Sequence, residues 1–92
     1  MTFKWDLTDI GRRFSSVVRI PGPGGSHVDG RSTFVDILIS ETGEILKSRV
    51  VNSSGDFNLD KKAPEALKLH KFQPGMVDGR PVTSAFIVQI DW

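Results

Sequence analysis

Two histidines, His27 and His70, are the side chains of this 92-residue sequence best suited to act as a base or to bind a metal near neutral pH. They are far apart in the chain, and neither belongs to an HExxH or His-x-His spacing that would indicate zinc. His27 lies near Asp29 in a glycine-rich stretch typical of a solvated loop. His70 follows an apolar helical pattern, so we expect it to pack rather than to react.

Three other segments resemble reactive motifs only superficially. The run Pro21-Gly22-Pro23-Gly24-Gly25 lacks the Gly-Lys-Ser/Thr ending of a phosphate-binding loop. Ser53-Ser54-Gly55 lacks the Gly-x-Ser-x-Gly pattern of a nucleophile elbow and is typical of a turn. The predicted helix also carries a basic group, formed by Lys61, Lys62, Lys68 and Lys71. It could contact an acidic partner, but it is more typical of a solvated helix face. We therefore predict no enzyme activity, no cofactor and no metal site.

The composition narrows the class of protein. The net charge of +1 gives no broad basic field, so we predict no nucleic-acid partner. The chain has no cysteine, which excludes disulfides and thiolate chemistry. Its longest apolar runs, residues 37–39 and 85–88, fall far short of the roughly 20 residues that span a bilayer. Residues 1–6 contain no signal-peptide core, so we expect a soluble domain or a soluble piece of a larger protein.

Alternating patterns predict three strands. In residues 32–40 successive side chains point to opposite faces, and both faces are partly apolar, as in a central strand. Residues 44–53 form the return strand after a Glu41-Thr42-Gly43 hairpin, with an irregular pattern that a bulge could explain. Residues 81–92 alternate most cleanly, after a tight turn at Asp78-Gly79.

Between the second and third strands, the spacing predicts one main helix. Asn58 or Asp60 could cap its start, Pro64 fits its first turn, and Pro74-Gly75 ends it. Its apolar face is formed by residues three and four apart: Leu59, Ala63, Ala66, Leu67 and His70.

The first third of the chain is less regular. Phe3, Leu7, Ile10 and Phe14 have the spacing of one or two helical turns. Residues 17–20 are short and β-like, and residues 21–31 form a loop rich in glycine and proline.

These elements predict an α+β fold of order β-β-α-β, with a possible extra N-terminal helix or strand. The sheet is three-stranded and antiparallel in the order 2-1-3, with one helix packed on one face. The last strand then pairs with the first, and its far side is an open edge unless residues 16–20 cover it.

After the first two strands come, in order, Ser53-Ser54-Gly55-Asp56, the helical segment, Phe72-Gln73-Pro74, Asp78-Gly79 and the alternating last strand. This order of motifs resembles the C-terminal domain of TonB-type energy transducers. The resemblance covers residues 32–92 and leaves residues 1–31 as an atypical N-terminal extension. This sequence departs from the family at two places. The family usually has an aromatic residue where this chain has His70, and Tyr-Pro where it has Ile20-Pro21. The residues that carry the structural motif are Ser53, Ser54, Gly55, Leu67, Phe72, Pro74 and Gly79.

The resemblance implies a periplasmic domain of a protein anchored in the inner membrane. It implies docking of the TonB box of an outer-membrane transporter by strand addition, driven by an inner-membrane proton-powered motor, for active uptake. An open edge could also pair with a second copy, giving a homodimer. The alternative is a TonB-like interaction or sensor domain of another envelope protein. The implied docking strand consists of Thr83, Ser84, Ala85, Phe86, Ile87, Val88, Gln89 and Ile90.

Overall fold

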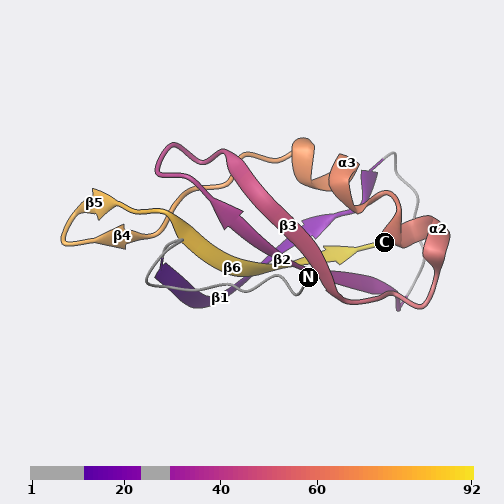
Figure 1. The fold of residues 1–92 in the computed structure, drawn as a ribbon. Coiled ribbons are helices and arrows are strands. Elements are labelled where there is room, and N and C mark those ends of the chain that lie inside the picture. The colour runs from indigo at the N-terminus through magenta and orange to yellow at the C-terminus, as the bar shows by residue number, and fades with distance from the viewer. Residues whose placement is uncertain (1–11, 24–29) are drawn as a thin grey trace, which may run out of the picture.

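The structure, a computed structural model, describes residues 12–23 and 30–92 (Figure 1). A four-stranded sheet carries two short helices on one face, and a two-stranded ribbon projects from one end. In chain order the elements are β1 (Arg12–Pro21), β2 (Ser32–Ile39), β3 (Ile45–Asn52), α2 (Phe57–Asp60), α3 (Ala63–Lys68), β4 (Met76–Val77), β5 (Arg80–Pro81) and β6 (Ser84–Asp91).

The four-stranded sheet has the order β1-β6-β2-β3. β2 pairs antiparallel with both β3 and β6, so the three predicted strands are neighbours in the predicted order. The prediction of a three-stranded, wholly antiparallel sheet is nevertheless wrong in detail, because β1 adds a fourth strand that runs parallel to β6. The sheet is therefore mixed, and the fold is α+β.

The two central strands owe their positions to apolar residues on both faces. On β2, Val35, Ile37 and Ile39 point into the main core, as the alternation predicted. Asp36 and Leu38, on the opposite face, are each only 3% exposed. A strand buried on both sides is stable in the middle of a sheet, where neighbours on both sides satisfy its backbone groups.

β3 is an edge strand, and most of it is exposed to solvent. Its pairing with β2 shifts register between Phe34 and Val35 and again between Leu38 and Ile39, which confirms the irregularity predicted from the sequence. The hairpin that leads into it turns at Gly43, whose φ of 89° suits glycine. Ser40 Oγ accepts a 3.1 Å hydrogen bond from the Glu44 amide and fixes this turn.

The predicted helix is divided into α2 and α3 by a turn at residues 61–62. Asp56 caps α2, because its carboxylate accepts a 2.8 Å hydrogen bond from the Asn58 amide. The predicted caps, Asn58 and Asp60, are therefore wrong. Pro64 lies in the first turn of α3, where its missing N–H does least harm.

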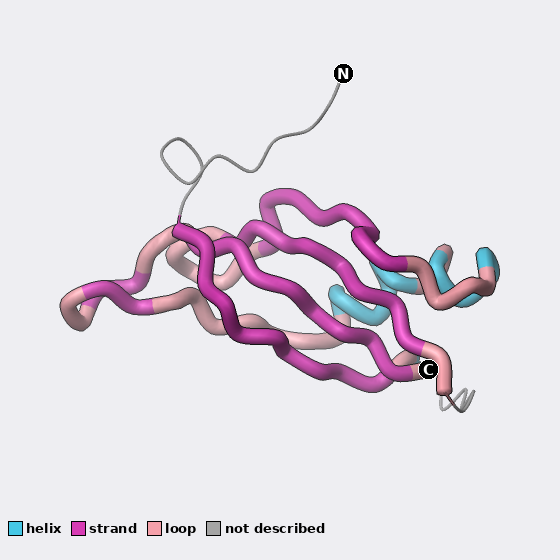
Figure 2. Tube along the Cα trace, turned by 90° about the horizontal axis from the view of Figure 1, so that it is seen from below, coloured by secondary structure: helices cyan, strands magenta, loops and turns pink. Residues whose placement is uncertain are grey.

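The main core lies between the helices and one face of the sheet. Figure 2 shows the four strands side by side with the helices on one side of them. Ala63 and Ala66 are almost fully buried, and their small side chains let α3 lie close to the sheet. The helical segment contributes Leu59, Ala63, Ala66, Leu67 and Phe72 to this core.

The N-terminal predictions have mixed outcomes. Phe14, expected on a helix, lies within β1. The other residues of that predicted helix, in residues 1–11, lie outside the described part of the chain, as do His27 and Asp29. The β-like run at residues 17–20 belongs to β1, which continues through Pro21.

Candidate functional site

The candidate docking strand is β6, the most regular strand of the sequence. Of the residues predicted to form the docking edge, Ser84 to Ile90 lie on β6 and Thr83 directly precedes it. β6 lies between β1 and β2, so its far side is paired in this structure. The far side of β6 was expected to be open unless residues 16–20 covered it; residues 17–20 do cover it, together with the rest of β1.

β1 follows β6 from one end to the other. Seven register pairs join the strands, from Arg12 opposite Ser84 to Pro21 opposite Asp91. Backbone bonds close both ends: the Arg12 amide donates to Thr83 at 2.9 Å, and the Gly22 amide donates to Asp91 at 2.8 Å. Four steps along β1, from Arg13 to Val17, match only two steps along β6, so β1 bulges in between.

On the helix-side face, β1 contributes little to the core. Ile20 is its one buried residue, and Phe14 and Val18 pack against the core while remaining half-buried. A small cleft of about 130 Å³ remains where the bulge passes over β6. It is lined by Phe14, Ser16, Val18, Gln73, Gly75 and Phe86. β1 is thus joined to β6 mainly through backbone pairing rather than through apolar burial.

On the opposite face, an ion pair connects β1 to the second strand away. Arg13 Nη2 lies 2.6 Å from Asp36 Oδ2 on β2. On β6, which lies between these strands, Ala85 is the register partner of Arg13 and Ile87 that of Asp36, and Ala85 is only 1% exposed. The Asp36 side chain is 4% exposed and the Arg13 side chain 34%. This ion pair is therefore half shielded from water and is screened less than a surface pair.

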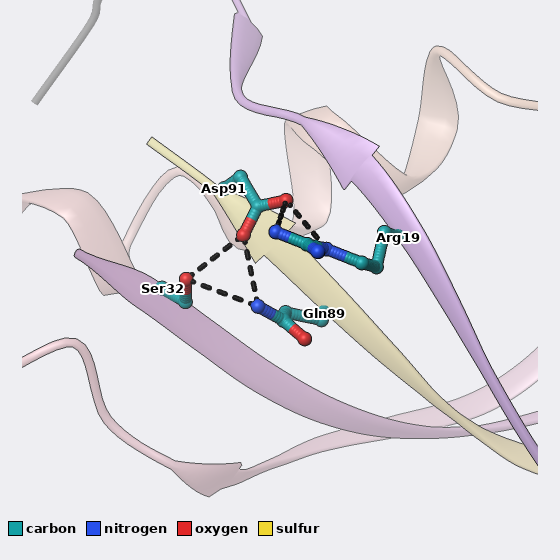
Figure 3. Close-up of polar contacts among 4 residues, drawn as sticks. All are labelled: Arg19, Ser32, Gln89 and Asp91. Carbon is teal, nitrogen blue, oxygen red and sulfur yellow. Dashed lines mark hydrogen bonds and ion pairs between the residues drawn. The ribbon is translucent and has the colours of Figure 1, made fainter. Parts of the chain in front are cut away.

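A second polar contact ties the other end of β1 to the sheet (Figure 3). Asp91 receives hydrogen bonds from Arg19 on β1 at 3.0 Å, from Ser32 on β2 at 2.9 Å and from Gln89 on β6 at 3.0 Å. Burial raises the pKa of Asp91, but these hydrogen bonds and the charge of Arg19 outweigh burial and hold its pKa below the usual range. The Arg19 guanidinium is largely exposed, so this contact with β1 is weak.

The Ser53-Ser54-Gly55 turn is an anchor for Asp60. The Asp60 carboxylate accepts hydrogen bonds from the hydroxyls of Ser53, Ser54 and Thr33, and from the Ser54 amide. Burial raises the pKa of Asp60, but these four bonds outweigh burial and lower it to about 2. Gly55 takes a φ of 89° and allows the turn. The sequence suggested Asp60 as a helix cap, and its actual partners could not be read from local spacing.

The remaining predicted motif residues have structural surroundings. Leu67 and Phe72 are buried in the core, and the Phe72 ring lies 6.0 Å from that of Phe86, centroid to centroid. Pro74 follows them and is half-buried. Gly79 takes a φ of 77° in the Asp78-Gly79 turn that joins β4 to β5, which confirms the predicted turn.

His70 lies beside a groove of about 400 Å³ between β3 and α3. The other lining residues are Gly43, Glu44, Ile45, Ser48, Pro64, Leu67 and Lys68. His70 is half-buried, and the four lysines of the basic group are exposed. No group of three or more His, Cys, Asp or Glu side chains that could hold a metal occurs within residues 12–23 and 30–92. Over the same residues, no helix has the length and apolar character needed to cross a bilayer.

Comparison with known proteins places this sheet in a family. No curated protein sequence and no solved structure matched the chain significantly. The sequence profile described as "Gram-negative bacterial TonB protein C-terminal" matches residues 29–92, which include β2 through β6 and both helices. Because this match covers more than half of the sequence, the chain belongs to the family of TonB C-terminal domains, a family of periplasmic protein-interaction domains.

Proposed function

We propose that this domain docks the TonB box of an outer-membrane transporter as an added strand along β6, using the backbone of residues 83–90. In this proposal the domain transmits the pull of an inner-membrane, proton-driven motor and so supports active uptake. Residues 32–92 form the docking domain, and the protein to which they belong is anchored in the inner membrane. The family membership of the chain and the pairing of β6 support the proposal.

The observation that carries the proposal is the pairing of β6 with β1. Seven register pairs along one side of β6 indicate that this side accepts an extended segment, and that the segment lies parallel to β6. Strand addition depends chiefly on backbone N–H and C=O groups, so another extended segment of suitable shape can use the same groups. A docking partner would replace β1.

The replacement is feasible because, of the four strands, only β3 is more exposed than β1. Most of its side chains are exposed or half-buried, and within the described part of the chain its outer edge has no further strand. β1 is held by backbone pairing and two ion pairs. A partner that replaces it forms similar interactions with β6, so the net free-energy cost of the exchange is low.

A designed disulfide tests the proposal in the full chain. Val17 and Ile87 are register partners on β1 and β6, and the sequence contains no other cysteine, so Val17→Cys with Ile87→Cys gives a single cross-link. In the reduced form, a synthetic TonB-box peptide should shift the amide signals of residues 83–91 in a titration. In the oxidised form, where β1 cannot leave, those shifts should disappear.

The same pair of samples identifies the opposite outcome. If the oxidised form binds the peptide as tightly as the reduced form, β6 is not the docking strand. Amide shifts confined to residues 45–52 would then place docking at β3, which lies at the other edge of the sheet. A single Val17→Cys variant controls for the loss of the valine side chain.

A further inference from the structure

We propose that the strand site beside β6 selects an extended segment that carries a basic side chain opposite Ala85, and that Asp36 recognises this side chain. The inference rests on the proposed function and goes further, because it names the chemistry of the partner. β1 is the chain's own occupant of the site, and its Arg13 is the group that a partner must reproduce.

Asp36 is the reason for the selectivity. It is 3% exposed, yet it lies on the sheet face opposite the helices, where the main core does not surround it. Its Oδ2 pairs with Arg13 at 2.6 Å, and its Oδ1 accepts no hydrogen bond from the described residues. A buried carboxylate is unfavourable unless it is paired and hydrogen-bonded. A segment that replaced β1 without supplying a cation would leave Oδ2 unpaired as well.

The basic residues of β3 on this face of the sheet do not remove this requirement. Lys47 is the register partner of Leu38, two residues from Asp36. Arg49 of β3 is the register partner of Asp36 on the side away from β6. It makes interactions of its own, but the carboxylate oxygen Oδ1 remains without a hydrogen bond in the described part of the chain. On the side that faces the strand site, Asp36 Oδ2 is held by Arg13 within the described part of the chain.

The register fixes where the basic side chain must stand. Arg13 is paired with Ala85, and Ala85 is paired with Leu38, two residues from Asp36 on β2. The small methyl group of Ala85 leaves a path over β6 for a long side chain. Arginine and lysine have the length for this reach, and arginine can also offer two N–H groups to the two carboxylate oxygens.

The apolar requirements of the site follow from the same register. On the helix-side face, Val18 lies opposite Val88 and Ile20 opposite Ile90. Because Ala85 precedes those positions by three and five residues, a regular occupant needs apolar residues three and five positions after its basic residue. β1 places them five and seven positions after Arg13, because its bulge adds two residues.

The tether gives β1 an advantage over any separate segment. Residues 22–31 join β1 to β2, and a short linker holds an intramolecular ligand at an effective concentration on the order of millimolar. A partner must therefore match the side-chain chemistry of β1 to compete with it. The basic residue opposite Ala85 is the part of that chemistry that carries charge specificity.

The test uses disulfide capture on the full chain carrying Ile87→Cys, in a glutathione buffer. The reference peptide copies residues 12–21 with Val17→Cys, so that its thiol faces that of the chain. A second peptide adds Arg13→Gln, and a third adds Arg12→Gln instead, which gives the same net charge. Arg12 is an exposed residue of the same strand, so it is the matched control. The tethered β1 competes equally with all three peptides.

We expect the Arg13→Gln peptide to be captured about tenfold less than the reference, as for the loss of a hydrogen bond to a charged group. The Arg12→Gln peptide should match the reference within about twofold. In a chain that also carries Asp36→Asn, the difference between the peptides should disappear. If the Asp36→Asn variant folds poorly, the capture of the three peptides by the chain that keeps Asp36 still tests the inference.

Three results would overturn the inference, and they differ in what they say about docking. Equal capture of all three peptides would show that the site takes a strand without charge selection, which leaves the proposed docking intact. A preference for Arg13 that persists with Asp36→Asn would assign the recognition to another group. If no peptide were captured, both the inference and docking along β6 would fail.

Discussion

The indole N–H of Trp92, the last residue, donates a 2.8 Å hydrogen bond to the hydroxyl of Thr33 at the start of β2. The same hydroxyl donates to Asp60 Oδ1 at 2.7 Å. This chain of bonds joins the end of β6, the start of β2 and the end of α2. It is shielded from water, since Thr33 is fully buried and Trp92 is 3% exposed.

Replacing Thr33 with valine keeps the shape of the side chain and removes the hydroxyl. The indole N–H then loses its acceptor and Asp60 loses one donor, so Thr33→Val should lower the free energy of unfolding by about 1–3 kcal/mol. Urea denaturation measures this change. The control Thr42→Val, in an exposed hairpin, should change stability by less than about 0.5 kcal/mol. Equal effects for the two variants would show that the buried bond adds nothing.

Asp60 should make stability depend on acid pH. Its pKa of about 2 in the folded chain lies below its ordinary value of 3.8. The ionised carboxylate therefore stabilises the fold fully above pH 3.8, and this stabilisation is lost as the pH falls toward 2. Urea midpoints measured over this range should fall with pH, and Asp60→Asn should reduce the slope. Asp91→Asn should act in the same direction, because the pKa of Asp91 is also lowered. An unchanged slope in both variants would contradict the assignment.

Phe72 should be a principal contributor to the core. Its ring is 7% exposed and packs against Phe86, so Phe72→Ala should lower the free energy of unfolding by about 3–5 kcal/mol. Phe57, which is 75% exposed, is the matched control. Phe57→Ala should have an effect below about 1 kcal/mol. A similarly small loss for Phe72→Ala would show that the ring is not part of the core.

Gly75 should control how firmly β1 is held. A methyl group on Gly75 would come within 2.1 Å of the Phe14 ring, so Gly75→Ala must displace that ring. Because Phe14 is one of the few residues of β1 that pack against the core, β1 amides should then exchange faster with solvent. Amide exchange along β3, which is remote from this contact, should be unchanged. As a control, Met76→Ala at the exposed neighbouring residue should leave the amide exchange of β1 unchanged.

The same variant bears on docking. If β1 competes with a partner, loosening it through Gly75→Ala should raise the apparent affinity for a peptide at β6. Faster exchange of β1 without any gain in peptide affinity would show that β1 does not limit access to the site.

Much of this fold follows from local sequence patterns. The alternation of Val35, Ile37 and Ile39 identified the core face of β2, and the alternation in residues 84–91 identified β6. Glycine marked the turns at Gly43 and Gly79, because these positions need positive φ. These features depend on residues close together in the chain, so the sequence alone reveals them.

The candidate site was predicted less well, since it depends on distant contacts. Ser53, Ser54 and Gly55 were expected to form a turn, but the hydrogen bonds of Ser53 and Ser54 to Asp60 depend on how α2 returns to the sheet. Likewise, Asp36 looked like an ordinary polar residue of a strand, and its ion pair requires Arg13 to lie two strands away. No periodicity encodes either relationship.

By itself, the sequence determined the three regular strands, the helical segment and the resemblance to TonB C-terminal domains, because side-chain period and turn chemistry are local properties. Only the tertiary structure decided that β1 occupies the far side of β6. The alternation of β1 is interrupted by its bulge, and Ile20 is its one buried residue, so its pattern is too weak to predict a partner. Its position depends on backbone pairing with a strand that follows it by about 70 residues, and a strand's outer edge is open or covered only once the whole sheet has formed.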